Sequence, residues 1–251
     1  MTETRLDVAL VQRGLVPSRE RAQEAIAAGL VLVDGRPAAK PALKTTDDTQ
    51  IQVTGDPIGY VGRGGLKLEG ALDRFAISPA GLVCMDVGAS TGGFTDCMLR
   101  RGARLVYAVD VGRDQLHADL RRDPRVVVME GTDIRTVTAL PEAPALASID
   151  VSFISLTLVL PAVARLLAPG ALIVALIKPQ FEVGPGHVGK KGIVKDPRQH
   201  RSAVDRVLSA AQALGLRCGE VMDSPVLGTE GNKEFLTTFQ LITNPDQLGT
   251  K

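Results

Sequence analysis

The apolar positions of residues 82–241 fall into two alternating patterns. Short continuous apolar runs, typical of strands buried on both faces, occur at 82–84, 105–109 and 172–177. Between such runs, the segment 156–167 carries apolar residues at helical spacing along one face. Strands that alternate with helices predict a parallel sheet with right-handed crossovers, and therefore an α/β fold.

The first 54 residues have a different pattern. A short amphipathic helix is predicted from Leu6 to about Gly14, and Ser18 is placed to cap a second helix over residues 19–28. Residues 31–33 and 49–53 then predict two strands of a small sheet, the first of which enters a tight Asp-Gly turn. Two helices followed by a small sheet make a compact accessory domain.

Gly and Pro residues crowd the segment 55–65, which predicts a linker. A helical stripe of apolar residues that begins at Leu68 follows it. We therefore expect an accessory domain at residues 1–54 and a larger domain at residues 66–245.

The sequence MDVGASTGGFT at residues 85–95 lies where a strand gives way to a predicted helix, 96–101. Glycines at such a turn let the backbone approach a nucleotide-like ligand, and the helix N-terminus offers unpaired N–H groups. Asp86 would repel a pyrophosphate but hold a cationic amino-acid end. The spacing from Gly88 to Gly92 also departs from the dinucleotide pattern G-x-G-x-x-G. The turn therefore favours S-adenosylmethionine over NAD, with a purely structural turn as the remaining alternative.

Charged residues lie at the ends of several predicted strands. Asp110 follows an apolar run and is placed to receive a ribose diol, while Asp150, Lys178 and Glu234 flank other runs. Strand ends of this kind line the ligand crevice of open α/β sheets. If Lys67 joins the last three, two cations and two carboxylates share one pocket. Such a lysine is placed to take a proton from a hydroxyl beside a sulfonium.

Composition narrows the environment but does not identify a partner. The net charge is +1, and residues 1–54 carry seven Lys or Arg and seven Asp or Glu. Net charge alone therefore does not predict a nucleic-acid partner. Three cysteines without C-x-x-C spacing indicate a reducing compartment. The apolar segment 156–177 is long enough to span a bilayer, but Pro161 and then Pro169-Gly170 are expected to break it into two units, a helix and a buried strand. We expect a cytoplasmic protein with no membrane span.

The accessory domain resembles the S4 RNA-binding domain. The resemblance implies an RNA surface on the second helix and the following turn; the alternative is ordinary solvated charge. The residues that carry the resemblance are Arg5-Leu6-Asp7, Ser18-Arg19, Ala22, Ile26, Gly29, Val31, Val33-Asp34-Gly35 and Lys40-Pro41. The residues assigned to RNA are Arg5, Arg19, Arg21, Arg36 and Lys40.

The whole chain resembles the TlyA family, whose members are known as haemolysin-like proteins and as ribosomal RNA 2′-O-methyltransferases. Its catalytic half resembles the FtsJ-type methyltransferases, with their Lys-Asp-Lys-Glu tetrad. The resemblance implies a Rossmann-like, mostly parallel sheet with an antiparallel last strand. It also implies metal-free methylation of a cytidine ribose in small-subunit, possibly also large-subunit, ribosomal RNA. The motifs RGGLK, DVSFIS, IKPQFE and GNKEF give the tetrad as Lys67, Asp150, Lys178 and Glu234.

The resemblance also assigns the cofactor contacts, and the position of the loop after Lys178 suggests further RNA contacts. The cofactor's methionine end is expected among Asp86, Gly88, Ser90, Gly92 and Phe94, its ribose at Asp110, its adenine amine at Asp133 and an aromatic wall at Phe153. A solvated loop aspartate is the alternative for Asp133. Arg63, Lys190 and Lys191 are expected to contact RNA, the two lysines on a Gly- and Pro-rich flap over residues 182–200, for which a surface loop is the alternative.

Two other functions remain open on the sequence alone. The family's second name allows a membrane-active haemolysin, against which the divided apolar segment and the absence of a visible signal peptide argue. A methyltransferase fold that only binds RNA is disfavoured because all four tetrad positions are filled. Ribosomal RNA or a ribosomal subunit is the expected partner, and the oligomeric state is left open.

Overall fold

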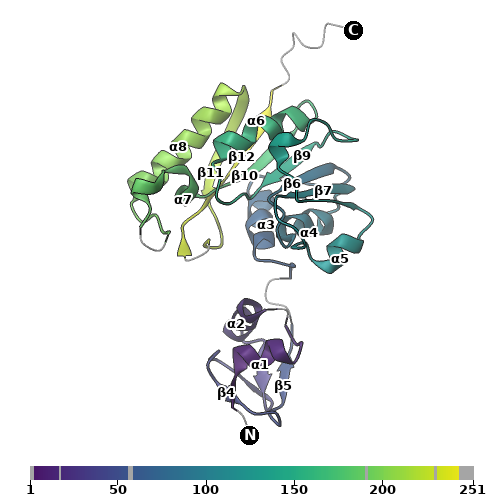
Figure 1. Cartoon of the computed structure of the whole chain (residues 1–251), viewed down its shortest axis with the longest axis vertical. Helices are drawn as coiled ribbons and strands as arrows, with labels where there is room; N and C mark the ends of the chain where they lie inside the picture. The colour runs from purple at the N-terminus through teal and green to yellow at the C-terminus, as the bar shows by residue number, and fades with distance from the viewer. Residues whose placement is uncertain (1–2, 17, 56–58, 190–191, 229–230, 243–251) are drawn as a thin grey trace. The chain divides into compact units, whose positions relative to one another are not determined.

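The structure is a computed structural model that describes residues 3–16, 18–55, 59–189, 192–228 and 231–242. It divides into two compact units, residues 1–59 (unit 1) and 60–251 (unit 2) (Figure 1). The division falls within the segment predicted as a linker, whose last two residues, Gly64 and Gly65, instead begin a helix of unit 2. The domain limits predicted from the sequence otherwise stay predictions.

Unit 1 holds the two predicted helices and small paired strands. Helix α1 spans Leu6–Gln12 and α2 spans Arg19–Ala27, and the Ser18 side chain accepts a hydrogen bond from the backbone N–H of Arg21 at 3.3 Å. Both residues of the Asp34-Gly35 turn have positive φ, 48° and 76°, as a tight turn between twisted strands requires. The strands are β1 (Thr4–Arg5), β2 (Val31–Val33), β3 (Arg36–Pro37), β4 (Lys44–Thr45) and β5 (Ile51–Val53), paired as β3-β2-β5 and β1-β4.

Unit 2 is built on a seven-stranded sheet in the order β11-β12-β10-β9-β6-β7-β8. Strand β12 pairs antiparallel with both β10 and β11, whereas β10, β9, β6, β7 and β8 pair in parallel. The expected mostly parallel sheet with an antiparallel last strand is confirmed. The strands are β6 (Val83–Val87), β7 (Leu105–Asp110), β8 (Val126–Glu130), β9 (Leu146–Ile149), β10 (Leu172–Ile177), β11 (Leu216–Asp223) and β12 (Phe235–Leu241).

Helices cover both faces of this sheet (Figure 1). Residues of α6 and α8 join one face of the sheet in a single buried core, and α4, which packs against α3, contacts β6 and β7. The helices are α3 (Gly64–Arg74), α4 (Gly93–Arg100), α5 (Ala118–Arg122), α6 (Leu156–Leu166), α7 (Pro179–Glu182) and α8 (Pro197–Ala213), with 3-10 turns at Ile134–Thr136 and Pro185–His187.

The long apolar segment 156–177 is divided as predicted into helix α6 and strand β10. Pro161 lies inside α6 and does not end it. Among the described residues, no helix is long and apolar enough to cross a membrane.

The topology places a ligand crevice beside β6. The chain runs from β6 through β7 to β8 on one side and returns to β9 and β10 on the other. The carboxyl ends of strands diverge at such a reversal, which is where open α/β sheets bind ligands. Helix α4 begins at Gly93, three residues earlier than predicted, because Gly92 at φ 97° turns the chain directly into it.

Candidate active site

Two adjoining cavities open at the crevice, with Gly88, Ser90 and Asp150 in the lining of both. The larger has a volume of about 570 Å³ and the smaller about 200 Å³. The larger is lined by residues that follow β6, β7, β8 and β9, and the smaller also by residues of α3 and by Leu227. The predicted cofactor residues in the larger cavity are Gly88, Ser90, Asp110, Asp133 and Phe153, and those in the smaller are Gly88, Ser90 and Phe94.

Glycine is required at two positions of the turn before α4. Gly88 has φ 87°, and a Cβ there would lie 2.4 Å from the backbone oxygen of Asp150. Gly92 has φ 97°, and a Cβ there would lie 2.2 Å from the side chain of Leu120. Gly88 lines both cavities, whereas the space beside Gly92 is filled by the side chains of Leu116 and Leu120.

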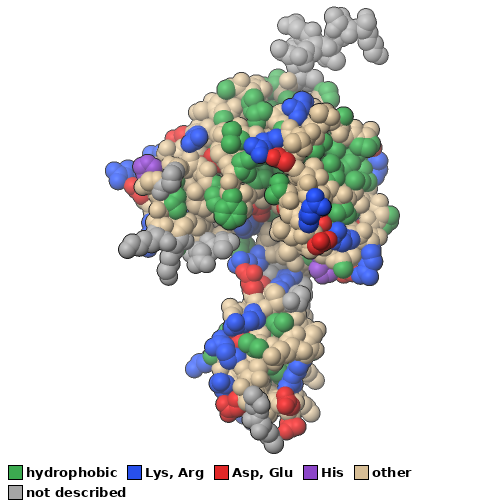
Figure 2. All heavy atoms as spheres, in the orientation of Figure 1, with side chains coloured by type: hydrophobic (Ala, Val, Ile, Leu, Met, Phe, Trp, Pro, Cys, Tyr) green, Lys and Arg blue, Asp and Glu red, His purple; other side chains and the backbone are tan. Residues whose placement is uncertain are grey.

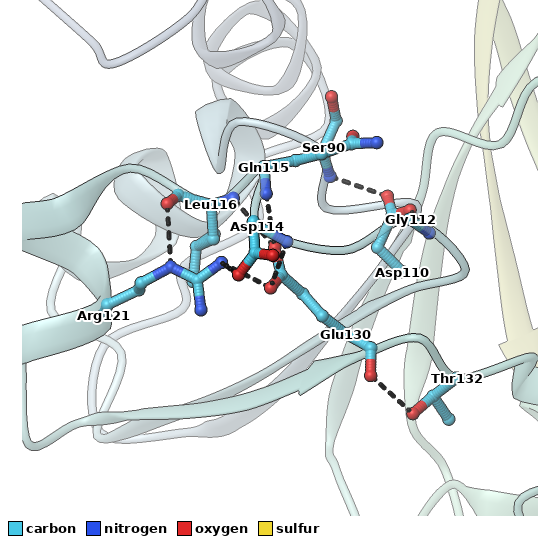
Figure 3. Close-up of polar contacts among 9 residues, drawn as sticks. All are labelled: Ser90, Asp110, Gly112, Asp114, Gln115, Leu116, Arg121, Glu130 and Thr132. Carbon is cyan, nitrogen blue, oxygen red and sulfur yellow. Dashed lines mark hydrogen bonds and ion pairs between the residues drawn. The ribbon is translucent and has the colours of Figure 1, made fainter.

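Asp110 fixes the backbone around the larger cavity. Its carboxylate accepts hydrogen bonds from the N–H groups of Ser90 at 2.8 Å and Gly112 at 2.6 Å (Figure 3). It thereby ties the turn after β6 to the loop after β7. Because a carboxylate has about four lone-pair sites, Asp110 retains acceptor capacity toward the cavity.

Glu130, at the end of β8, holds the loop that follows Asp110 and was not predicted from the sequence. It accepts hydrogen bonds from the N–H groups of Asp114, Gln115 and Leu116 at 2.8–2.9 Å and pairs with Arg121 (Figure 3). Burial raises the pKa of Glu130, but the hydrogen bonds from Leu116, Arg121 and the neighbouring amides outweigh it and hold this pKa at about 2. The signal was present, because Glu130 ends an apolar strand just as Asp110 does.

Asp86, predicted at the cofactor's methionine end, lies beneath the turn that follows β6. Its side chain is fully buried and lines neither cavity. The carboxyl group accepts hydrogen bonds from the hydroxyls of Thr95 at 2.7 Å and Ser148 at 3.0 Å. Burial raises the pKa of Asp86 to about 7, although these two hydrogen bonds lower it. Asp86 therefore joins β6 to α4 and β9 beneath the turn.

Asp133 and Phe153, predicted at the cofactor's adenine amine and as its aromatic wall, both line the larger cavity. Asp133 pairs with Arg135, whose hydrogen bonds hold the pKa of the Asp133 carboxyl below its usual value. Phe153 has φ 64° and is 92% exposed, with its ring 5.1 Å from that of Phe181. A positive φ at an aromatic residue is strained, and such strain is concentrated at functional sites.

The four tetrad residues come from four separate elements and form two ion pairs. Lys67 of α3 lies 2.7 Å from Glu234, which precedes β12, and their side chains are 11% and 2% exposed. Lys178, which follows β10, lies 2.6 Å from Asp150, which follows β9. Lys178 also donates a hydrogen bond to Ser152 at 2.9 Å. Lys67 and Asp150 both line the smaller cavity, so the two pairs meet at one site.

Glu182 anchors the loop that carries Asp150 and was not predicted as a site residue. It is 2% exposed and accepts hydrogen bonds from the Ser155 hydroxyl at 2.6 Å and the N–H of Leu156 at 2.8 Å. Burial raises the pKa of Glu182. Lys178 and Glu182 thus hold the two ends of loop 150–156 from one short segment, IKPQFE at residues 177–182.

The residues predicted to contact RNA are placed unevenly. Arg36 and Lys40 are exposed and Arg21 is half-buried, while Arg5 and Arg19 both pair with Asp7. Several Lys and Arg side chains (blue) lie on the face of unit 1 that Figure 2 shows. In unit 2, Arg63 lines the smaller cavity, and the predicted contacts Lys190 and Lys191 lie outside the described residues.

Comparison with known proteins agrees with this geometry. The FtsJ-like methyltransferase family matches residues 60–241, and the S4 domain matches residues 4–51. The "16S/23S rRNA (cytidine-2'-O)-methyltransferase TlyA" of Mycobacterium tuberculosis is 50% identical over 96% of this chain and 91% of its own. A protein of Streptococcus thermophilus, named as a hemolysin, has a solved structure with a TM-score of 0.76 and 44% identity, covering 98% of this chain and 90% of its own.

The fold is shared more widely. An S-adenosylmethionine-dependent methyltransferase of Mesorhizobium loti has a TM-score of 0.54 at 15% identity, covering 71% of this chain and 100% of its own. Fold and family together define an S-adenosylmethionine-dependent methyltransferase with an S4 domain at its N-terminus, which confirms the predicted cofactor. Within that class, the chain belongs to the TlyA family of FtsJ-like methyltransferases.

Proposed function

We propose that this protein transfers a methyl group from S-adenosylmethionine to the ribose 2′-hydroxyl of a cytidine in ribosomal RNA. The observation that carries the proposal is the meeting of two lysine–carboxylate pairs, Lys178–Asp150 and Lys67–Glu234, at a cavity that shares a wall with the cofactor-sized one. Site chemistry of this kind needs only a hydroxyl nucleophile and an activated methyl donor. The rRNA cytidine-2′-O activity named for the relative from M. tuberculosis supports the choice of substrate.

The larger cavity fits the methyl donor. Its volume lies within the ~300–1,000 Å³ of small-molecule sites. Gly88 and Ser90 bring the backbone close, Asp110 has acceptor capacity for a ribose diol, and Phe153 supplies an aromatic wall. We assign Asp133 to the adenine end of the cofactor, where its ion pair with Arg135 keeps the Asp133 carboxyl group ionised. When bound, S-adenosylmethionine supplies a methyl group already activated by its sulfonium.

We assign the proton of the reacting hydroxyl to Lys178. As the ribose oxygen forms its bond to the methyl carbon and the sulfur–carbon bond breaks, the hydroxyl proton passes to the Nζ of Lys178, which acts as a base in its neutral amine form, after its ammonium has released a proton to solvent. Asp150 and Ser152 hold this Nζ in place. Lys67, held by Glu234, orients the hydroxyl and the adjoining phosphate. The leaving group is neutral, so the reaction does not require a metal.

RNA delivery is assigned to unit 1, supported by its S4 match, and to Arg63 at the edge of the smaller cavity. We propose ribosomal subunits of the cytoplasm as the substrates. The small subunit is the first choice, and the relative named for both 16S and 23S RNA supports testing the large subunit too.

The test is transfer of labelled methyl from S-adenosylmethionine to purified 30S and 50S subunits, followed by mapping of alkali-resistant ribose positions. Replacing Lys178 with Ala is expected to reduce transfer by about 10²-fold or more, since general-base catalysis contributes about 10²–10⁴. The variant should still bind the cofactor, which shows that unit 2 is folded. Arg217→Ala, at an exposed basic residue of β11 in unit 2 outside both cavities, is the control and should transfer at the wild-type rate. A cofactor-bound wild-type protein that labels neither subunit would contradict the proposal.

A further inference from the structure

Asp7 is a fully buried carboxylate at the start of α1 to which three side chains donate hydrogen bonds. Arg5 donates from Nε to Oδ1 at 3.0 Å and from Nη2 to Oδ2 at 3.2 Å. Arg19 donates from Nη2 to Oδ2 at 2.9 Å, and Gln23 from Nε2 to the same oxygen at 3.1 Å. The Asp7 side chain is 0% exposed. One buried group therefore holds two arginines that are separated by 14 positions in the sequence.

Both arginines keep donors available to a ligand. Their side chains are 43% exposed at Arg5 and 57% at Arg19. A guanidinium has five N–H donors, of which Asp7 occupies one edge in Arg5 and one nitrogen in Arg19. The remaining donors are those that bind a phosphate oxygen, often two at a time.

The segment after β3 is tied to the same place. The backbone N–H of Asp7 donates to the carbonyl of Pro41 at 3.1 Å, and that of Leu6 to Leu43 at 2.8 Å. These bonds locate the neighbouring exposed Lys40 relative to α1. Three parts of unit 1 that carry basic residues thus converge on Asp7.

Asp7 is ionised whenever this arrangement exists. The hydrogen bonds from Arg5 lower the pKa of Asp7 well below its usual range, and burial, which raises it, is outweighed by these bonds together with those from Arg19 and Gln23. A buried carboxylate of this kind holds its partners, since releasing one arginine costs a charge-assisted hydrogen bond and releasing both would leave the buried charge uncompensated. The guanidinium groups are therefore ordered before any ligand binds.

We propose that Asp7 is a positioning residue for RNA binding, which holds the guanidinium groups of Arg5 and Arg19 in place for a backbone phosphate. The proposal rests on the proposed function, because that function makes RNA the ligand of unit 1. Ordering a long side chain at an interface costs about 0.5–1.5 kcal/mol, and Asp7 removes that cost for two of them before RNA arrives.

Positioning and charge predict opposite outcomes for Asp7→Asn. If charge alone mattered, removing a carboxylate beside a phosphate site would tighten RNA binding by relieving repulsion. If Asp7 positions the arginines, the substitution should release them. The Asn side chain has an NH₂ group where Asp7 has a carboxylate oxygen, and this donor cannot accept a hydrogen bond from a guanidinium. We then expect the Kd for purified 30S and 50S subunits, at one fixed salt concentration, to rise about tenfold. An unchanged or lower Kd would overturn the proposal.

Two further variants separate position from charge. Asp48→Asn removes an exposed carboxylate of the same unit and should leave the Kd equal or slightly lower. Asp7→Glu keeps the charge but displaces the carboxylate by one methylene, and should raise the Kd as Asp7→Asn does. Wild-type affinity in Asp7→Glu would overturn the positioning role.

Folding of unit 1 is checked by hydrogen exchange of the α2 amides in the full chain, because residues 1–59 contain no Phe, Tyr or Trp to follow optically. The wild-type protein offers a test that needs no variant. The Nε–H of Arg5 should exchange slowly with water in the free protein by nuclear magnetic resonance, and rapid exchange would overturn the proposal. If the wild-type protein binds neither subunit, the proposed function fails together with this inference. If the wild-type protein binds and the Asp7 variants bind with the same Kd, this inference alone is overturned.

Discussion

Asp86 makes the stability of unit 2 depend on pH in an unusual direction. Its carboxyl group is fully buried, and burial raises its pKa to about 7, from 3.8 for an exposed aspartate. The native state therefore holds a proton between these values that the unfolded chain releases. Stability contributed by the bound proton is complete below pH ~4 and is lost as the pH rises through 7.

The size of the effect follows from the two pKa values. Each unit of pKa difference corresponds to about 1.36 kcal/mol, so ionising Asp86 costs the native state up to about 4 kcal/mol. Between pH 5 and pH 8 linkage gives a loss of about 2.5 kcal/mol in the free energy of unfolding. The carboxylates with lowered pKa, such as Glu130, are ionised in both states across this window and add no slope.

Replacing Asp86 with Asn should remove this slope. The amide matches the shape of the acid, and the hydroxyls of Thr95 and Ser148 can rotate to donate or accept, so both contacts persist. We expect the variant to gain about 2.5 kcal/mol relative to wild type between pH 5 and pH 8. Denaturant unfolding followed by tyrosine fluorescence measures it, since both tyrosines, Tyr60 and Tyr107, lie in unit 2.

Asp205→Asn, at an exposed aspartate of α8, is the matched control and should keep the wild-type pH dependence. An Asp86→Asn variant whose stability falls with pH as steeply as the wild type would refute the reasoning. The same variant tests the role predicted from the sequence. Because Asp86 lines neither cavity, its Kd for S-adenosylmethionine at pH 8 should stay within a few-fold of wild type. A loss of 100-fold would restore Asp86 to the methionine end of the cofactor.

Three further changes probe the site. Gly88→Ala places a Cβ 2.4 Å from the oxygen of Asp150 at a positive φ, so calorimetry should show at least tenfold weaker cofactor binding and chemical unfolding a loss of about 2 kcal/mol. Glu182→Gln weakens two charge-assisted hydrogen bonds to the loop that carries Asp150, and should lower kcat about tenfold with little change in cofactor Kd. An unaltered kcat would contradict the role of Glu182 in holding this loop. Lys67→Met should cost about 3–5 kcal/mol because it leaves Glu234 buried and unpaired, whereas adding Glu234→Leu should restore most of the stability without restoring methyl transfer.

Local patterns in the sequence predicted the structural features that depend only on residues close together in the chain. The cap at Ser18, the Asp34-Gly35 turn and the division of segment 156–177 each follow from chemistry within a few positions. The strand-end positions of Asp110 and Asp150 followed from apolar runs alone. The gathering of these ends at one crevice needed only the rule that parallel strands share an edge.

The orientation of individual side chains depended on register and could not be predicted in this way. Asp86 lies opposite Ser148 in the parallel pairing of β6 with β9, which turns its side chain toward α4 and away from the cavities. Glu182 shows the same limit, because its partners at Ser155 and Leu156 belong to a loop 26 or 27 residues away. Nothing in the local pattern distinguishes such a carboxylate from a solvated one.

The charges of the described site also explain why composition gave so little indication of RNA. The tetrad contains two lysines and two carboxylates, so its formal charge is zero, and residues 1–54 are formally neutral as well. Attraction to phosphate must then come from the arrangement of charges rather than from their sum. Asp7 turns two arginines outward while its own charge is buried, and the tetrad carboxylates hold lysines at a cavity wall. If the proposed function holds, an affinity that depends on arrangement should fall when a carboxylate is displaced by one methylene, as Asp7→Glu tests, and net charge does not measure it.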